Sequence, residues 1–127
     1  MANKTMTNLE IYNYASALMS SFNTEMTLPV KVNFYLQKNT NTMIEAGKEI
    51  EKARMDIINK YGTPTEDGEG VEIPNEHIEV VNKELEDLFS LEQEIKVNEI
   101  SLEAFNDVEL TTTQVAAIAF MIKDEEE

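Results

Sequence analysis

The stretch from Thr27 to Gly62 constrains the fold most, because it reads as one long helix. Thr27 can cap this helix, Pro29 fits its first turn, where a missing N–H costs nothing, and Gly62 predicts a left-handed residue after its end. A helix that ends at Lys60 or Tyr61 is ~50 Å long at 1.5 Å per residue, which is longer than a compact domain needs. The sequence therefore predicts a spine helix against which the rest of the chain packs.

Apolar and small residues recur along this helix at alternating steps of three and four, the spacing of a coiled-coil stripe. The stripe consists of Leu36, Asn39, Met43, Ala46, Ile50, Ala53 and Ile57. Its alanines allow another helix to approach closely, and Asn39 would fix the register against a partner helix at some cost in stability. Because so long a stripe needs more cover than short helices give, we expect a homo-oligomer with this stripe as its seam.

Three further segments predict shorter helices, over residues 8–22, 75–90 and 114–122. Thr7 and Glu10 form a capping box before the first of them, in which each side chain satisfies a backbone donor of the first turn. Four methionines fall on apolar stripes and are interpreted as core residues rather than as a binding groove. They are Met19, Met43, Met55 and Met121.

Two short strands complete the expected elements. Val71 and Ile73 alternate with polar residues after an acidic turn, and Ile95 and Val97 alternate in the same way later in the chain, so the two strands could pair. The predicted fold class is mainly α, with one long spine helix, two or three shorter helices and a short β-hairpin or strand pair. A length of 127 residues predicts a single helical domain over 1–127.

Charge is distributed unevenly along the chain. The net charge is −15, and residues 65–127 carry 19 acidic side chains against three lysines. Such a surface repels nucleic acid and anionic membranes and attracts a basic protein, so we expect no direct nucleic-acid binding. A dense acidic group either imitates the phosphates of DNA or forms an ordinary solvated helix face. Its members are Glu84, Glu86, Asp87, Glu92 and Glu94.

Side chains that carry catalysis are scarce. The chain has no Cys, its one histidine is His77, and its four glycines form no phosphate-binding loop. No nucleophile elbow surrounds any serine. We therefore predict a protein that is not an enzyme, with no catalytic residue and no cofactor. The chain shows no apolar run that could span a bilayer and no signal-peptide pattern, so a soluble cytoplasmic protein without membrane contact is expected.

The acidic turn after the long helix allows a calcium-site interpretation beside an ordinary one. With Gly70 at the sharp turn, Asp67 and Glu69 would be ligands and Glu76 the closing ligand of a calcium loop. Thr65 would then be the first ligand, which departs from the pattern. An ordinary acidic turn is the better interpretation, and we expect no metal site.

The first half of the long helix is free of acid, because no carboxylate lies between Glu25 and Glu45. Three explanations stay open: this part faces another subunit, it lines a pocket for a small anion such as a nucleotide, or its composition is accidental. For the pocket, lysines would supply charge and aromatic rings a stacking face. The candidate ligand-binding residues are Lys31, Asn33, Phe34, Tyr35, Lys38 and Asn39.

The order of the predicted parts carries a resemblance. A helix ending in "KYG" is followed by an acidic "EDGEG" turn, a helix "NKELEDLFSLE", a strand "EIKVNEISLEAF" and a closing "VELTTTQVAAIAFMI". Over roughly Leu28 to Ile122 the chain resembles a family of short uncharacterised proteins encoded by phages and prophages of Gram-positive bacteria. The resemblance implies a phage origin and the cytoplasm of a bacterial host. It brings no activity and no functional residues.

Two functions follow as expectations. The first is a non-catalytic phage binding protein, a counter-defence factor that sequesters a host immune component, either a nucleotide signal or a protein. The alternative is a virion or tail assembly accessory that binds a phage structural protein.

Overall fold

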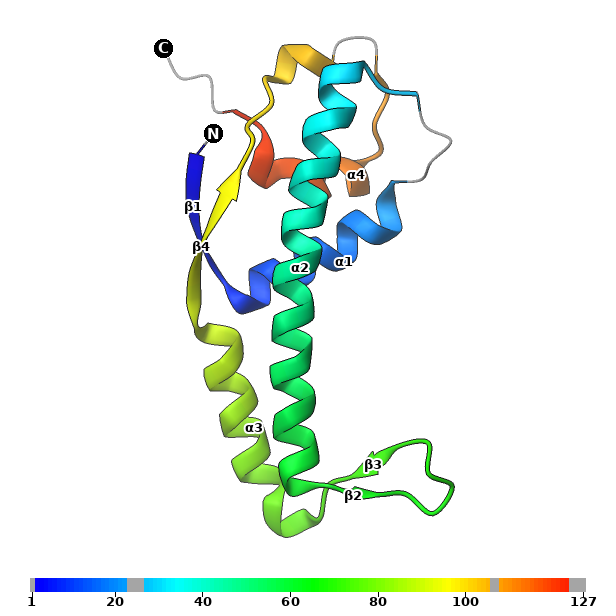
Figure 1. Cartoon of the computed structure of the whole chain (residues 1–127), viewed down its shortest axis with the longest axis vertical. Coiled ribbons are helices and arrows are strands. Elements are labelled where there is room, and N and C mark those ends of the chain that lie inside the picture. Colours follow the sequence, from blue (N-terminus) through cyan, green and yellow to red (C-terminus); the bar gives the residue numbers. More distant parts are fainter. Residues whose placement is uncertain (1, 23–26, 106–107, 124–127) are drawn as a thin grey trace.

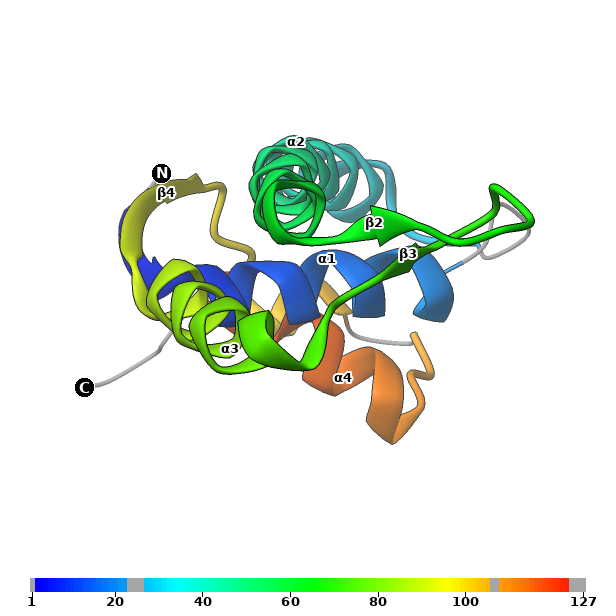
Figure 2. The ribbon, with the colours of Figure 1, turned by 90° about the horizontal axis from the view of Figure 1, so that it is seen from below.

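A long helix, α2, forms the axis of the structure, a computed structural model that describes residues 2–22, 27–105 and 108–123 (Figure 1). Seen from one end, α2 makes one layer, α1 and α3 lie in a second, and α4 lies beyond α1 (Figure 2). The helices are α1 (Asn8–Ser21), α2 (Val30–Tyr61), α3 (Asn75–Ser90) and α4 (Thr112–Ile118), with short 3-10 turns at Leu102–Phe105 and Ala119–Met121. The prediction of a mainly α fold with one long helix and a small β element is confirmed.

The two ends of α2 differ from the sequence prediction in detail. Pro29 occupies the N-cap position, outside the first turn, because its ψ of 146° is extended. Its carbonyl accepts the N–H of Asn33 at 2.9 Å, so the predicted Thr27 cap is wrong. Gly62 has φ −96°, so the predicted left-handed conformation is also wrong. A glycine is required there because a Cβ would lie 2.2 Å from Cγ1 of Val71.

The helices α1 and α4 each begin at a capping box. The Thr7 hydroxyl accepts the backbone N–H of Glu10, and the Glu10 carboxylate accepts the backbone N–H of Thr7. Thr111 and Gln114 make the same reciprocal pair at the start of α4. These pairs satisfy donors that a helix start leaves without intrahelical partners. α1 begins at the predicted residue, and α4 begins two residues before its predicted start.

The strands form two separate antiparallel pairs. β1 (Ala2–Thr7) pairs with β4 (Glu92–Val97), with Ala2 opposite Val97, and β2 (Thr63–Pro64) pairs with β3 (Val71–Glu72). The predicted pairing between the Val71 and Val97 strands is therefore wrong. β1 escaped prediction because its sequence, ANKTMT, contains one large apolar residue, Met6, which is buried.

Shorter elements of the same chain cover most of the stripe on α2. Leu36, Met43 and Ile50 are buried, and α1, α3 and β4 contact α2 on this side. The stripe is therefore internal, and the expectation that it docks onto another subunit is wrong for these residues. The main core consists of Met6, Ile11, Ala15, Leu18, Val32, Leu36, Met43, Ile50, Ile95, Val97, Ile100, Phe105, Ala117, Ile118, Phe120 and Met121.

The lower end of the molecule has little core. Only Val81 is buried in α3, and it stands outside the main cluster. Beyond Ile50, α2 buries no residue. The ring of Tyr61 packs on that of His77, with centroids 5.5 Å apart, so the single histidine has a packing role at this end. Within the described ranges, none of the helices combines the length and apolarity that a membrane span requires.

Candidate functional site

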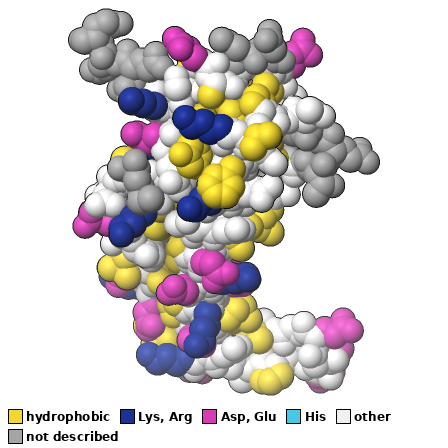
Figure 3. All heavy atoms as spheres, turned by 45° about the horizontal axis from the view of Figure 1, so that its top comes forward, with side chains coloured by type: hydrophobic (Ala, Val, Ile, Leu, Met, Phe, Trp, Pro, Cys, Tyr) yellow, Lys and Arg dark blue, Asp and Glu magenta, His cyan; other side chains and the backbone are white. Residues whose placement is uncertain are grey.

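The N-terminal third of α2 presents a face that combines cations and aromatic rings, here called the lysine–aromatic face: Lys31, Phe34, Tyr35 and Lys38. Lys31 Nζ lies 5.9 Å from the Tyr35 ring centroid, and Lys38 Nζ lies 5.3 Å from that of Phe34. The two rings are 5.9 Å apart. Because these residues lie three, four and seven positions apart, they share one side of the helix. Figure 3 shows lysines beside hydrophobic side chains on this side.

The two cations of this face differ from most other cations of α2 in their partners. Among the described residues, neither Lys31 nor Lys38 makes an ion pair, whereas Lys48 pairs with Glu45 and Arg54 with Glu51. Both lysines are exposed, and the positive end of the helix dipole lies close by. The face is therefore a small region of positive potential on a strongly acidic chain.

Asn39 does not belong to this face. Its side chain is 1% exposed, its Oδ1 accepts the backbone N–H of Asn98 at 2.8 Å, and its Nδ2 donates to the Asn98 carbonyl at 2.9 Å. The amide thus fixes the chain after β4 against α2. The predicted register role of Asn39 is found inside the chain, against β4, and its polar atoms are unavailable to a ligand.

A second surface runs between α1 and α2, here called the α1/α2 groove. Its upper hollow has a volume of about 510 Å³ and its lower one about 300 Å³, and both are lined by Met19 and Ile44. The side chains are mainly apolar, with amides at the rim. The lining consists of Tyr12, Ala15, Ser16, Leu18, Met19, Phe22, Leu28, Asn33, Leu36, Gln37, Thr40, Asn41, Ile44, Gly47, Lys48 and Glu51.

Met19 shows what the sequence interpretation missed. It was expected in the core, but its side chain is 64% exposed in the groove. The sequence contains a signal, because Leu18 and Met19 are adjacent and neighbouring residues of a helix point about 100° apart, so both cannot face one core. The structure buries Leu18, which is 3% exposed. Asn33 is the one predicted ligand residue that lines the groove, and Gln37 donates to its Oδ1 at 3.3 Å.

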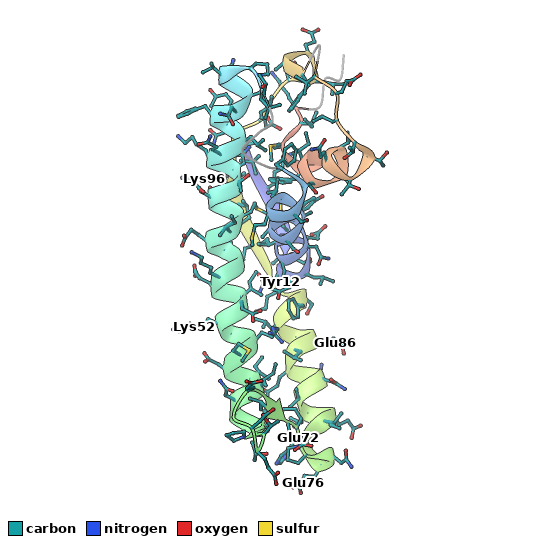
Figure 4. All side chains as sticks on the ribbon, turned by 90° about the vertical axis from the view of Figure 1, so that its right-hand side faces the viewer. Tyr12, Lys52, Glu72, Glu76, Glu86 and Lys96 are labelled. Carbon is teal, nitrogen blue, oxygen red and sulfur yellow. The ribbon has the colours of Figure 1, made fainter. Side chains whose placement is uncertain are left out.

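A fixed polar network closes the lower end of the groove. Tyr12 donates its hydroxyl to Glu51 at 2.9 Å, and Arg54 donates to both oxygens of the same carboxylate at 2.9 and 2.7 Å. The hydrogen bond from Arg54, supported by that from Tyr12, lowers the pKa of Glu51 to about 2. In return the Glu51 carboxylate raises the pKa of Tyr12. Figure 4 looks onto this side and shows Tyr12 between α1 and α2.

The acidic turn between β2 and β3 satisfies its own polar groups. Asp67 accepts the hydroxyl of Thr65 and the backbone N–H of Glu69, and these bonds lower the pKa of Asp67. The structure thus shows a closed turn, as the ordinary interpretation expects. In the part of the chain that is described, no three His, Cys, Asp or Glu side chains gather as a metal site would require.

Neither family models, nor curated proteins, nor solved structures gave a match to this chain. The resemblance to phage and prophage proteins stays a prediction.

Proposed function

We propose that the chain is a non-catalytic binding protein that holds an amphipathic helix of a partner protein in the α1/α2 groove. Together with the resemblance to phage proteins, this supports a counter-defence factor that sequesters a host immune protein. The observation that carries the proposal is the groove itself, a partly apolar hollow lined by Met19, whose side chain is 64% exposed. Concave surface with apolar lining is where binding sites usually lie.

The dimensions of the groove suit a helix. It follows α2 from Asn33 to Glu51, which corresponds to ~27 Å at 1.5 Å per residue, or about five helical turns. An amphipathic helix fills such a groove with apolar residues at every third and fourth position. The amides of Asn33 and Asn41 at the rim can meet polar groups at the edge of its apolar side.

Charge favours a basic partner. Residues 62–90 carry nine acidic side chains and one lysine. The β2–β3 hairpin projects on the same side of the molecule as the C-terminal end of α1, below the groove (Figure 1), and Glu72 and Glu76 mark this lower end in Figure 4. A basic helix or its flanking segment would be attracted to this end, which raises the rate of encounter.

A nucleotide ligand has less support than a protein. Lys31 and Lys38 do not line the groove, and their face is the convex surface of one helix. Sites for small molecules are concave and bury most of the ligand, with polar groups directed inward. Neither lysine lines any of three surface hollows, the two of the groove and a third between α1 and α4.

Substitution inside the groove tests the proposal. We expect Met19→Glu to abolish retention of the partner when tagged protein is recovered from host cells, because it places a charge among the apolar side chains that line the groove. Leu9→Glu is the matched control: Leu9 is also an exposed apolar residue of α1, at 49%, but lies outside the groove. The control should retain the partner as the wild type does.

Cross-linking identifies what lies in the groove. A photoreactive residue at position 19 should link to an amphipathic, basic helical segment of the partner. A link to a segment that is neither amphipathic nor basic, or equal retention of the partner by Met19→Glu and Leu9→Glu, would contradict the proposal. Recovery of the chain in purified virions would instead favour the assembly role.

A further inference from the structure

The side of α2 that points away from α1 and α3 carries two pairs of opposite charges at matching spacing. Lys31 and Lys38 are seven residues apart, and so are Glu49 and Asp56. Each lysine precedes one of the acids by 18 residues, which is about five turns, so the four side chains project from one side of the helix. All four are exposed.

None of these four charges is paired within the chain, as far as the described residues go. The ion pairs of α2 use other side chains, namely Glu45 with Lys48, Glu51 with Arg54, and Lys60 with Glu84 of α3. Lys52 likewise makes no ion pair among the described residues, so the charges of α2 without an ion pair gather on one exposed side, where opposite charges of a second protein can match them.

We propose that this face binds a second copy of the chain with the two α2 helices antiparallel. Lys38 then faces Glu49 of the partner subunit, and Lys31 faces Asp56 of the partner subunit. A two-fold axis repeats both pairs, so two lysines and two acids of each copy are matched. A parallel arrangement would place lysine on lysine and acid on acid, which is repulsive.

The same register matches the aromatic residues. Phe34, which is 56% exposed, comes onto the same flank of the contact as Lys52 of the partner subunit, and Tyr35 onto the other flank with Ala53 of the partner subunit. A small residue leaves room for a ring, and a lysine over a ring is favourable by cation–π attraction. Figure 4 shows Lys52 directed away from α1 and α3, on the side where the second copy would lie.

The face contains few apolar side chains, so charge dominates its affinity and we expect a salt-sensitive dimer. It lies apart from the α1/α2 groove, because Lys31, Lys38, Glu49 and Asp56 line neither hollow. Met19→Glu should therefore leave self-association unchanged. The proposed dimer and the proposed partner site can therefore be disproved independently of each other.

Charge reversal tests the register by analytical ultracentrifugation. The acidic variant, Lys31→Glu with Lys38→Glu, and the basic variant, Glu49→Lys with Asp56→Lys, should each raise the dissociation constant at least tenfold at low salt. Their equimolar mixture should form a heterodimer, because every position then faces its opposite. The variant with all four reversals should dimerise like the wild type.

Three results would overturn the proposal, the third of which concerns its register. One is a wild type that stays monomeric at low salt over the whole accessible concentration range. Another is a dimer that either double variant preserves, which would place the interface elsewhere. If the mixture pairs while the variant with four reversals does not, the antiparallel register is wrong. Circular dichroism checks that these exposed substitutions leave the fold intact.

Discussion

At the scale of single residues, Asn39 shows how a polar side chain can belong to an apolar stripe. Its amide satisfies both the N–H and the C=O of Asn98, which lies in a partly buried stretch after β4. Where the chain leaves a strand, a backbone N–H and C=O that have no other partner need a side chain of this kind. The sequence marks Asn39 as unusual but not its partner, because residues 39 and 98 are far apart in the chain.

We expect Asn39→Leu to lower the free energy of unfolding by about 2 kcal/mol, since it leaves two backbone groups of Asn98 without partners in a partly buried place. Urea denaturation measures this loss. Asn41→Ala is the control, because Asn41 is exposed on the same helix and should change stability by less than about 0.5 kcal/mol. Equal effects of the two substitutions would contradict the assigned role of Asn39.

Gly62 gives a second prediction at this scale. A Cβ there would lie 2.2 Å from Cγ1 of Val71 and 2.8 Å from the carbonyl oxygen of Ile58, so Gly62→Ala should cost about 1–3 kcal/mol through overpacking. At Gly70 the nearest atom to a Cβ is 3.7 Å away, and Gly70→Ala should be close to neutral. Thermal unfolding of both variants separates close approach from a general effect of losing glycine.

At the scale of elements, helices were predictable and strand pairs were not. Capping residues and periodicity are local signals, so the starts of α1 and α4 and the whole of α3 lie close to their predicted places. Strand pairing depends on which segments the fold brings together, and the pairing of β1 with β4 joins residues 2–7 to residues 92–97. No local pattern specifies a contact of that range.

The network that joins α1 to α2 makes stability depend on pH. The pKa of Glu51, about 2, lies below its ordinary 4.5. The stabilisation by Arg54 and Tyr12 is therefore complete above about pH 4.5 and is lost as the pH falls from there toward 2. Because Glu51 is 40% exposed, solvent keeps the gain to about 1 kcal/mol or less.

Glu51→Gln tests this coupling. The variant should be less stable than the wild type at neutral pH, and the difference should shrink as the pH is lowered through 4.5. Glu86→Gln is the control, an exposed carboxylate on α3 that accepts no hydrogen bond from the described residues and should show a flat difference. Denaturant titrations at several pH values provide the measurement; a constant deficit for Glu51→Gln would contradict the pH assignment.

At the scale of the whole molecule, stability is distributed unevenly along α2. The upper part of the helix is enclosed by α1, β4 and the closing segment, whereas residues 51–61 have no buried side chain and meet an α3 with only Val81 buried. Local opening free energies follow the number of buried apolar contacts. The lower end is therefore a low-stability extension of a better-packed upper body.

Hydrogen exchange makes this visible. Backbone amides of residues 54–61 and 78–86 should exchange at least tenfold faster than those of residues 36–50, because the lower end can open without disrupting the main core. Mass spectrometry of peptides from the full chain gives the comparison, and α2 supplies its own control since both regions are helical. Uniform protection along α2 would contradict a separately opening lower end.

The candidate site was predictable only in part. The acid-free stretch identified the lysine–aromatic face, since composition is visible in sequence. It could not show that Asn39 points inward, nor that Met19 lines a groove, because both depend on where α1 and β4 pack on α2. The sequence could assign these residues to a helix. Which of them face the core and which face solvent depends on the tertiary arrangement.

The pairing of β1 with β4 affects the order in which the chain can fold during its synthesis. The first strand emerges from the ribosome long before its partner at residues 92–97 is translated. At roughly 5–20 residues per second, it waits on the order of 5–20 seconds. During that interval the nascent chain can form the α1–α2 hairpin while Met6 lacks the cover of β4, so a strand made first is completed by one from the final third of the chain.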